Sequence, residues 1–451
     1  MSFQNKKMFH YFQMAKSRCG MVLTIFVMLM CITLILYSPL NYDAPFNLTR
    51  KSPPLSPLEV PNIAPINIRD STPPINTPAI MAPDHPVEKK VVEKAVTCPV
   101  YIFGDSLYDT GIAFFLGMGP MADSYPYGKT YFKRPAGRFS DGLLIPDYIG
   151  TPSESVNYLP FYFFIFLKNK QIFVLLAAQH ANQPFPEPYG NPVLVEYSRS
   201  VNFAGAAAGV LVDGRNYSLN LKLQTDLFEE MVGKMKLQYG KKKTKEIVSK
   251  AVLVFNIGSN DYTDIWIQNE KPLNSTFVNA FVNKILGNFT VAITRMYKQG
   301  ARKFAFQNYG PMGCLPLYRQ DDAHCAEGLN DLATLHNAGF AALANTWARH
   351  LPGFKYIIYD FYTSLMARVL NGAKYDFKET QTACCGSGRF HAKFTCMEKA
   401  NFTLCKDIPS HLFFDPAHTT QKANEQFAKE FWSGPPNLVV PFNMEKLCSI
   451  D

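Results

Sequence analysis

Charged residues are scarce in this sequence, and it has no basic stripe interleaved with aromatic residues. Asp, Glu, Lys and Arg make up 18% of the 451 residues, whereas hydrophobic residues make up 47%. This apolar content excludes a chain that is disordered throughout. Four of the cations behind the formal net charge of +9 lie before residue 20, and the remaining +5 is spread thinly, which argues against nucleic-acid binding.

The first 37 residues have the pattern of a secretory targeting signal. A basic segment at 1–19 precedes eighteen uncharged residues at 20–37, and no clean Ala-x-Ala cleavage site follows. The apolar run is longer than that of a typical cleaved signal and nearly long enough to span a bilayer. A transmembrane signal anchor and a signal peptide cut near Ala44 therefore both stay open. Either would send the rest of the chain to the lumenal or extracellular side.

A proline-rich linker is predicted at 38–94. Twelve prolines fall between residues 39 and 86, and the stretch has no hydrophobic period. Such a segment is typical of an extended spacer, and a stalk that binds a partner or a cell wall is the alternative. The folded domain is expected at 95–448.

Eight cysteines follow the signal region, an even number that fits disulfide bonds in an oxidising compartment. A zinc site in the cluster from Cys384 to Cys405 is the alternative, but its spacings match no zinc-ligand template. Which cysteines pair cannot be read from the sequence. Five Asn-x-Ser/Thr sequons agree with a secreted glycoprotein: Asn47, Asn216, Asn274, Asn288 and Asn401.

Beyond the linker, β-branched and aromatic runs alternate with long amphipathic segments. This alternation predicts an α/β fold with a mainly parallel sheet that is covered by helices on both faces. Ligands of such folds bind beyond the carboxyl ends of the strands. The predicted strands are Val96–Phe103, Ala251–Ile257, Lys303–Asn308 and Lys355–Phe361, and the predicted helices are 219–239, 276–299, 327–350 and 419–432.

Four residues at strand ends and before a helix are candidates for catalysis. Ser106 follows the first predicted strand in a Gly-Asp-Ser turn that could expose a nucleophile, although a helix cap has the same pattern. Asn260 follows the second strand and could donate to an oxyanion, or simply cap a turn. Asp415 precedes His418 by three residues, a spacing that lets the carboxylate orient the imidazole, or that makes an ordinary turn with a surface histidine.

Taken together and in order, these blocks resemble the GDSL esterase/lipase family of plants, a branch of the SGNH hydrolases. The resemblance covers most of residues 98–442. The blocks that carry it are VYIFGDSLYDTG, VNFAGAAAG, VFNIGSNDY and FFDPAHTTQKAN, with further family-like stretches in PYGKTYFKRPAGRFSDGLLIPDYI, GARKFAFQNYGPMGCLP and ACCGSG.

The resemblance implies a flavodoxin-like three-layer αβα sandwich and a serine hydrolase that needs no metal or cofactor. It implies that Ser106 is the nucleophile, His418 its general base and Asp415 the residue that orients His418. The oxyanion hole would combine the Ser106 N–H, a backbone N–H from Gly205 or Ala206, and the side-chain amide of Asn260. Gly205 stands where relatives often have Ser, Ala206 where Gly or Ala is usual, and Ile112-Ala113-Phe114 replaces the usual Asn run.

An atypical insertion is predicted at 150–177, because relatives pass almost directly from a Pro-Asp-Tyr-Ile-like segment into one like AAQHANQPFPEPYG. The insertion includes the aromatic run LPFYFFIFLKNKQIFVLL, which two lysines interrupt. An exposed lid that gathers lipid and a retained intron are the two interpretations. The abrupt change of composition favours the retained intron.

The expected activity is hydrolysis of lipid or other small-molecule carboxylic esters through an acyl-enzyme on Ser106. An acyltransferase that uses the same acyl-enzyme is one alternative. A catalytically idle, wall-associated binding protein is another. The sequence predicts no specific protein partner. It does not identify the natural ester.

Overall fold

The computed structural model describes residues 98–450, except for 121, 150–164, 168–169, 173–184, 193, 195, 212–217, 270–272, 320–322 and 398–400. These residues belong to one compact unit, Pro78–Asp451. The basic segment, the apolar run and the proline-rich linker predicted within 1–94 lie outside the described residues. Within the described ranges, no helix is both long and apolar enough to cross a membrane.

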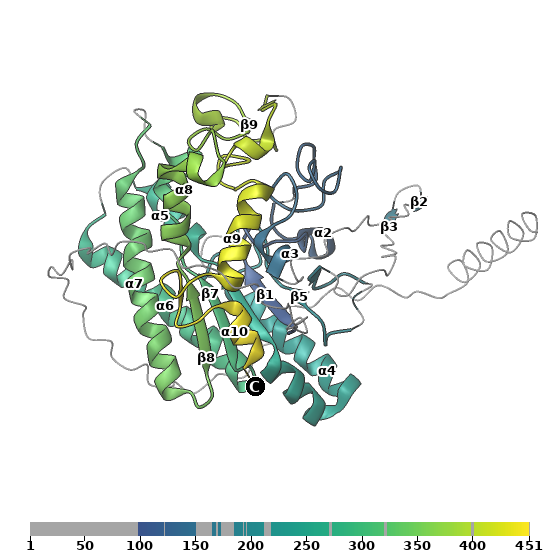
Figure 1. Ribbon diagram of the computed structural model, residues 1–451. Coiled ribbons are helices and arrows are strands. Elements are labelled where there is room, and N and C mark those ends of the chain that lie inside the picture. Colours follow the sequence, from purple (N-terminus) through teal and green to yellow (C-terminus); the bar gives the residue numbers. More distant parts are fainter. Residues whose placement is uncertain are drawn as a thin grey trace, which may run out of the picture. The chain divides into compact units, whose positions relative to one another are not determined.

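A seven-stranded sheet forms the centre of the domain, in the order β11-β8-β7-β6-β1-β5-β4 (Figure 1). All neighbouring strands are parallel except β11, which runs antiparallel to β8 at one edge. The four strands predicted from the sequence are confirmed. The three others are two residues long, too short to give a hydrophobic pattern. The strands are β1 Val100–Gly104, β4 Glu187–Pro188, β5 Val201–Asn202, β6 Val252–Asn256, β7 Lys303–Gln307, β8 Lys355–Tyr359 and β11 Val439–Val440.

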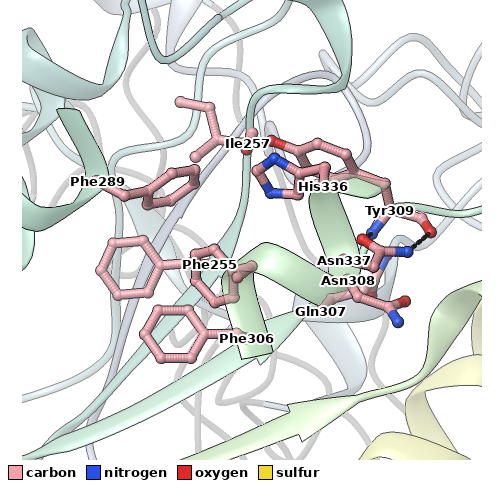
Figure 2. A pocket seen from close by; sticks show the side chains of 10 residues that line it. Phe255, Ile257, Phe289, Phe306, Gln307, Asn308, Tyr309, His336 and Asn337 are labelled. Carbon is pink, nitrogen blue, oxygen red and sulfur yellow. Dashed lines mark hydrogen bonds between the residues drawn. The ribbon is translucent and has the colours of Figure 1, made fainter. Parts of the chain in front are cut away.

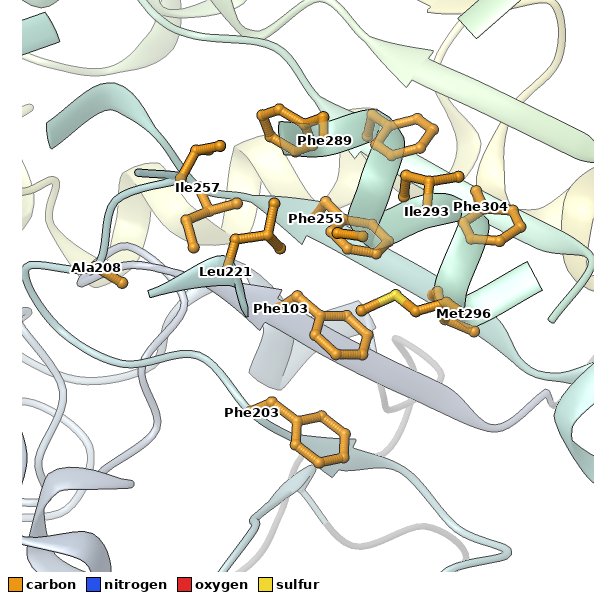
Figure 3. Close-up of a cluster of buried hydrophobic side chains, with 14 of the residues drawn as sticks. Phe103, Phe203, Ala208, Leu221, Phe255, Ile257, Phe289, Ile293, Met296 and Phe304 are labelled. Carbon is orange, nitrogen blue, oxygen red and sulfur yellow. The ribbon is translucent and has the colours of Figure 1, made fainter. Parts of the chain in front are cut away.

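Helices cover both faces of this sheet, so the predicted three-layer αβα sandwich is confirmed. Successive side chains of a strand point to opposite faces. On β1, Tyr101 and Phe103 face a core with α4, α6 and α7, while Val100 and Ile102 face a core with α3, α8, α9 and α10. Figure 3 shows the first core, where strand phenylalanines pack on the apolar side of α6. The helices are α2 Ala113–Leu116, α3 Ile145–Ile149, α4 Leu221–Lys250, α5 Ser259–Gln268, α6 Ser275–Lys298, α7 Glu327–His350, α8 Phe361–Leu370, α9 Gln421–Ser433 and α10 Met444–Ser449.

Helix boundaries follow local capping residues. The Asn274 side chain accepts the Phe277 N–H at 2.8 Å and starts α6, as an Asn N-cap does. The helix predicted at 219–239 reaches a kink at Gly240, whose φ of 78° is available to glycine, and a second segment continues to Lys250. Between the regular elements lie short 3-10 turns: η1 Met312–Cys314, η2 Pro316–Tyr318, η3 Gly372–Tyr375, η4 Arg389–His391 and η5 Ile408–Ser410.

The eight cysteines are joined in four disulfide bonds, as their even number predicted. Two of these bonds involve the adjacent residues Cys384 and Cys385. Strand β9 (Cys385–Gly386) begins at the second of them and pairs antiparallel with β10 (Thr403–Leu404). The four pairs are Cys98–Cys448, Cys314–Cys325, Cys384–Cys405 and Cys385–Cys396.

Most of the insertion predicted at 150–177 lies outside the described residues. Two described pieces of it, β2 (Ile165–Leu167) and β3 (Lys170–Ile172), pair with each other antiparallel. They form a separate two-stranded sheet and do not extend the central one. The lid and the retained intron therefore both stay open as interpretations.

Candidate active site

Ser106 lies on a tight turn that leaves the carboxyl end of β1. We call residues 104–109 the serine turn. Gly104 is required at its start, because a Cβ there would lie 2.7 Å from Tyr108 Cβ and 2.9 Å from the Asn256 carbonyl oxygen. The Asp105 carboxylate accepts the Leu107 N–H at 3.0 Å and the Ser259 hydroxyl at 3.0 Å, which fixes the turn. The sequence thus holds Ser106 half-buried at the edge of the sheet.

Asp415 and His418 lie on the loop before α9. Asp415 is buried, and its Oδ1 accepts the backbone N–H groups of Ala417 and His418, both at 2.9 Å. The Phe414 N–H donates to the His418 carbonyl at 2.8 Å and closes the loop. The short Asp-x-x-His spacing therefore folds the histidine back over its own carboxylate.

The fold brings Ser106, His418 and Asp415 together across 312 positions of the chain. His418 Nε2 lies 2.7 Å from Ser106 Oγ, and His418 Nδ1 lies 2.7 and 2.8 Å from the two Asp415 oxygens. The side chains of His418 and Asp415 are 12% and 4% exposed. A hydroxyl, an imidazole and a buried carboxylate in this order form the arrangement that activates a serine.

Two aromatic residues that the motif search did not single out support this arrangement. The Tyr127 hydroxyl donates to Asp415 Oδ2 at 2.9 Å, and the Phe139 ring lies 4.9 Å from the His418 ring. Burial and the neighbouring Asp415 charge raise the pKa of Tyr127 well above its usual range, so its phenol stays a donor. Both residues belong to the family-like stretch PYGKTYFKRPAGRFSDG, which was the only signal for them in the sequence.

The residues predicted for the oxyanion hole are in part already hydrogen-bonded. The Ser106 N–H makes no hydrogen bond to another described residue. Asn260 donates one side-chain N–H to the Ala208 carbonyl at 2.9 Å, and an Asn amide has a second N–H. The Gly205 N–H donates to the Gly104 carbonyl at 3.1 Å, and the Ala206 N–H to Asp109 Oδ2 at 2.8 Å. The Gly205 and Ala206 N–H groups, one of which was expected to serve the oxyanion hole, therefore both already donate to other acceptors.

One cluster with metal-ligand residue types lies in the described part of the domain: Cys384, Cys405 and His411. Its two cysteines are bonded to each other, so their sulfurs are not available as thiolates. The zinc interpretation of this cysteine cluster is therefore not supported.

A small cavity beside β6 and β7 is lined by another histidine, the buried His336 (Figure 2). His336 Nδ1 lies 2.8 Å from the Tyr262 hydroxyl, and its ring stacks on Tyr309 at 4.1 Å. Burial lowers the pKa of His336 to about 3. The buried Gln307 Nε2 has no hydrogen-bond partner among the described residues, whereas Gln307 Oε1 accepts the Tyr108 hydroxyl at 2.8 Å. The cavity has no serine or carboxylate among its lining residues and is not the active site.

Comparison with known proteins agrees with this geometry. The family profile described as GDSL-like lipase/acylhydrolase matches residues 100–431. The chain belongs to the plant GDSL esterase/lipase family. It is therefore a carboxylic ester hydrolase, and the predicted family and enzyme class are confirmed.

Relatives of this GDSL esterase/lipase cover most of its length. GDSL esterase/lipase 4 of Arabidopsis thaliana is 34% identical over 77% of this chain and 89% of its own. The GDSL lipase of Tanacetum cinerariifolium is 33% identical over 77% and 87%. Another Arabidopsis relative, 31% identical over 77% of this chain and 74% of its own, is named an inactive GDSL esterase/lipase-like protein.

Proposed function

We propose that this GDSL esterase/lipase cleaves carboxylic esters through an acyl-enzyme on Ser106. His418 is the general base and Asp415 orients it. The observation that carries the proposal is the continuous line of contacts of 2.7 Å from Ser106 Oγ through the imidazole to the Asp415 carboxylate. A serine without such a base is a poor nucleophile at neutral pH.

The steps follow from this geometry. Neutral His418 accepts the hydroxyl proton at Nε2 while Ser106 Oγ attacks the ester carbonyl carbon. The tetrahedral intermediate collapses when the imidazolium returns the proton to the leaving alcohol, and the acyl group stays on Ser106. His418 then takes a proton from a water molecule as the water oxygen attacks the acyl carbonyl carbon. The second tetrahedral intermediate collapses when the imidazolium gives this proton to Ser106 Oγ, which releases the acid and the free serine. Asp415 stabilises the imidazolium in both halves of the reaction.

The developing oxyanion requires donors near Ser106 Oγ. We assign the Ser106 N–H and the second side-chain N–H of Asn260 to this role. A backbone N–H of the Gly205–Ala206 turn is the third donor that the family resemblance implies. Each well-aimed donor lowers the barrier by about 3 kcal/mol.

Passage through the secretory pathway is part of the proposal. Four disulfide bonds are typical of proteins that fold in an oxidising compartment. Sensitivity of the expressed full chain to an N-glycosidase tests entry into this pathway, and carbonate extraction tests membrane attachment. A cytosolic, unglycosylated chain contradicts the proposed location.

Ser106→Ala tests the nucleophile. We expect this variant to lose both fluorophosphonate labelling and hydrolysis of p-nitrophenyl butyrate. Ser200→Ala is the matched control, because the Ser200 hydroxyl accepts the Val100 N–H at the opposite end of β1, and it should remain labelled. Normal hydrolysis by Ser106→Ala contradicts the assignment. Adding alcohol acceptors to the wild-type assay separates the alternatives, since an acyltransferase forms new ester faster than free acid.

A further inference from the structure

Asp109 is a buried carboxylate that the proposed reaction does not use. It lies three residues after Ser106, at the end of the serine turn, and is 1% exposed. Its Oδ1 accepts the N–H groups of Gly111 at 2.7 Å and Ile112 at 2.9 Å. Its Oδ2 accepts the Ala206 N–H, 97 positions away, at 2.8 Å. Hydrogen bonds to one carboxylate thus connect the serine turn to a loop that is distant in the sequence.

That loop contains the turn at residues 205–208, which we call the alanine turn. Three hydrogen bonds hold this turn. The Gly205 N–H donates to the Gly104 carbonyl, and the Ala206 N–H donates to the Asp109 carboxylate. The Ala208 carbonyl accepts the Asn260 side-chain N–H. Ala207 within it has a φ of 59°, an uncommon value for a residue with a side chain. An alanine in this conformation needs its neighbours fixed, and Asp109 fixes the neighbour on its N-terminal side.

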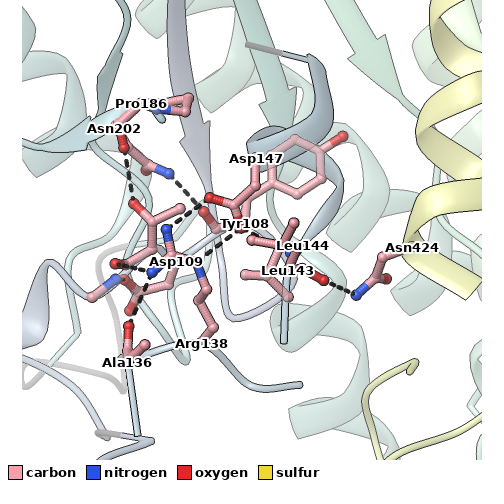
Figure 4. A network of polar contacts seen from close by, with 12 residues as sticks. Tyr108, Asp109, Ala136, Arg138, Leu143, Leu144, Asp147, Pro186, Asn202 and Asn424 are labelled. Atoms are coloured by element: carbon pink, nitrogen blue, oxygen red, sulfur yellow. Dashed lines mark hydrogen bonds and ion pairs between the residues drawn. The ribbon is translucent and has the colours of Figure 1, made fainter. Parts of the chain in front are cut away.

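The charge of Asp109 is unfavourable for the fold. Burial raises its pKa to about 6, although three backbone N–H groups and the Arg138 guanidinium act in the opposite direction. Figure 4 shows Asp109 in the polar network with Arg138 and Asp147. Arg138 is already paired with Asp147 at 2.7 Å and also faces Glu187, so it only partly compensates Asp109. A buried anion that its surroundings do not neutralise is typical of a functional position.

We propose that Asp109 is a positioning residue of the active site: its carboxylate sets the alanine turn, whose Ala208 carbonyl holds the Asn260 amide, relative to Ser106. This inference rests on the proposed acyl-transfer function. The anion presents strong acceptors to all three N–H groups. In Asn, a side-chain NH2 that cannot accept replaces one carboxylate oxygen, and in the protonated acid a hydroxyl, which is a weaker acceptor, replaces it. The turn then moves away from the serine without any change in the triad.

The pH dependence of the wild-type enzyme is the first test. Full activity requires neutral His418 and ionised Asp109, so the rate falls when either side chain is protonated. We expect log(kcat/KM) for p-nitrophenyl butyrate to fall with a slope that steepens from one to two below about pH 6. A slope that stays at one down to pH 4.5 overturns the proposal, whether or not any variant folds.

Asp109→Asn is the second test. We expect kcat to fall about 10- to 100-fold with KM within about threefold, and the low-pH limb to keep a slope of one. Asp109→Glu, which restores the anion, should recover part of kcat. Asp360→Asn is the matched control, because Asp360 accepts the Thr363 N–H at the start of α8 and Asn caps helices equally well. Circular dichroism checks the fold of each variant.

The outcomes separate this inference from the proposed function. If Ser106→Ala hydrolyses the ester normally, the proposed function fails and the inference fails with it. If Ser106→Ala is inactive but a folded Asp109→Asn keeps kcat within twofold of wild type, only the inference fails.

Discussion

His418 and His336 each lie against a hydroxyl group, and their surroundings differ in one essential respect. His418 Nε2 is 2.7 Å from Ser106 Oγ, and His336 Nδ1 is 2.8 Å from the Tyr262 hydroxyl. Behind His418 lies the Asp415 carboxylate, in contact with Nδ1. His336 has no carboxylate within hydrogen-bond distance among the described residues, and aromatic rings surround it.

A short histidine–hydroxyl contact is not by itself a catalytic pair. A general base must carry a proton for part of the cycle, and a buried imidazolium is stable only beside an anion. Burial alone lowers the pKa of His336 to about 3, so it stays neutral under physiological conditions. His418 has both an anion and partial access to solvent, which the reaction requires.

Removal of the anion behind His418 should have the largest effect. Asp415→Asn leaves the imidazole in place but replaces the oxygen that orients and stabilises its charged form. We expect kcat to fall about 10³- to 10⁴-fold with little change in KM. Steady-state kinetics with p-nitrophenyl butyrate measures this.

Asp141→Asn is the control for Asp415→Asn. Asp141 is also buried and accepts a backbone N–H, that of Gln421 at 2.7 Å, but it does not contact His418. We expect it to lose stability and less than tenfold in kcat. Equal losses of kcat in both variants would mean that Asp415 acts only through folding.

The second histidine should matter for stability and not for catalysis. His336→Phe keeps an aromatic ring but leaves the buried Tyr262 hydroxyl without its partner, which costs about 1–3 kcal/mol. We expect the free energy of unfolding to fall by this amount at pH 7.5, while kcat stays within about twofold. Urea denaturation and the ester assay measure the two quantities.

The pH dependence of stability sharpens this prediction. The unfolded chain takes up a proton at an ordinary imidazole pKa of about 6.5, whereas folded His336 does so only at about 3. Stability is therefore lost as the pH falls through this window, by an amount on the order of 3–5 kcal/mol. His336→Phe should remove this part of the slope, and His350→Phe, at the exposed end of the same helix, should not. An unchanged slope in His336→Phe would contradict the assignment.

Much of this domain could be predicted from the sequence, because its signals are local. Strands buried on both faces give continuous apolar runs, and the polar residues that follow them mark the carboxyl edge of the sheet. Ser106 and Asn260 follow such strands, whereas Asp415 and His418 are marked by their three-residue spacing before a helix. The structure brings Ser106, Asp415 and His418 into contact. Their catalytic roles stay predictions until the variants are measured.

The rest depends on contacts between distant segments. Tyr127 reaches Asp415 across 288 positions, and no local pattern marks a tyrosine as the donor to a carboxylate. The acceptors that occupy the Gly205 and Ala206 N–H groups come from the serine turn, so a sequence motif could not reveal them. The pairing of the cysteines has the same origin.

Tyr127→Phe should have the smallest effect of these changes when each is expressed as a free energy. It tests how much the hydrogen bond from Tyr127 to the Asp415 carboxylate contributes to catalysis. The variant keeps the ring that packs edge-on against Phe139 and Phe414, each at 5.6 Å, and removes only the hydroxyl that donates to Asp415. Two backbone N–H groups still hold this carboxylate. We therefore expect a three- to tenfold fall in kcat, about 1 kcal/mol, and a small change in melting temperature.

Because the pKa of Tyr127 lies well above its usual range, the loss in Tyr127→Phe should be the same from pH 6 to pH 9. Tyr101→Phe is the control, since the buried Tyr101 hydroxyl donates to the Tyr197 carbonyl away from the site, and it should leave kcat unchanged. An equal loss of kcat in both variants would mean that Tyr127 affects the rate only through the stability of the fold. A loss of kcat in Tyr127→Phe alone would mean that the hydrogen bond to Asp415 contributes to catalysis. The carboxylate beside His418, which His336 lacks, would then be what distinguishes the catalytic histidine.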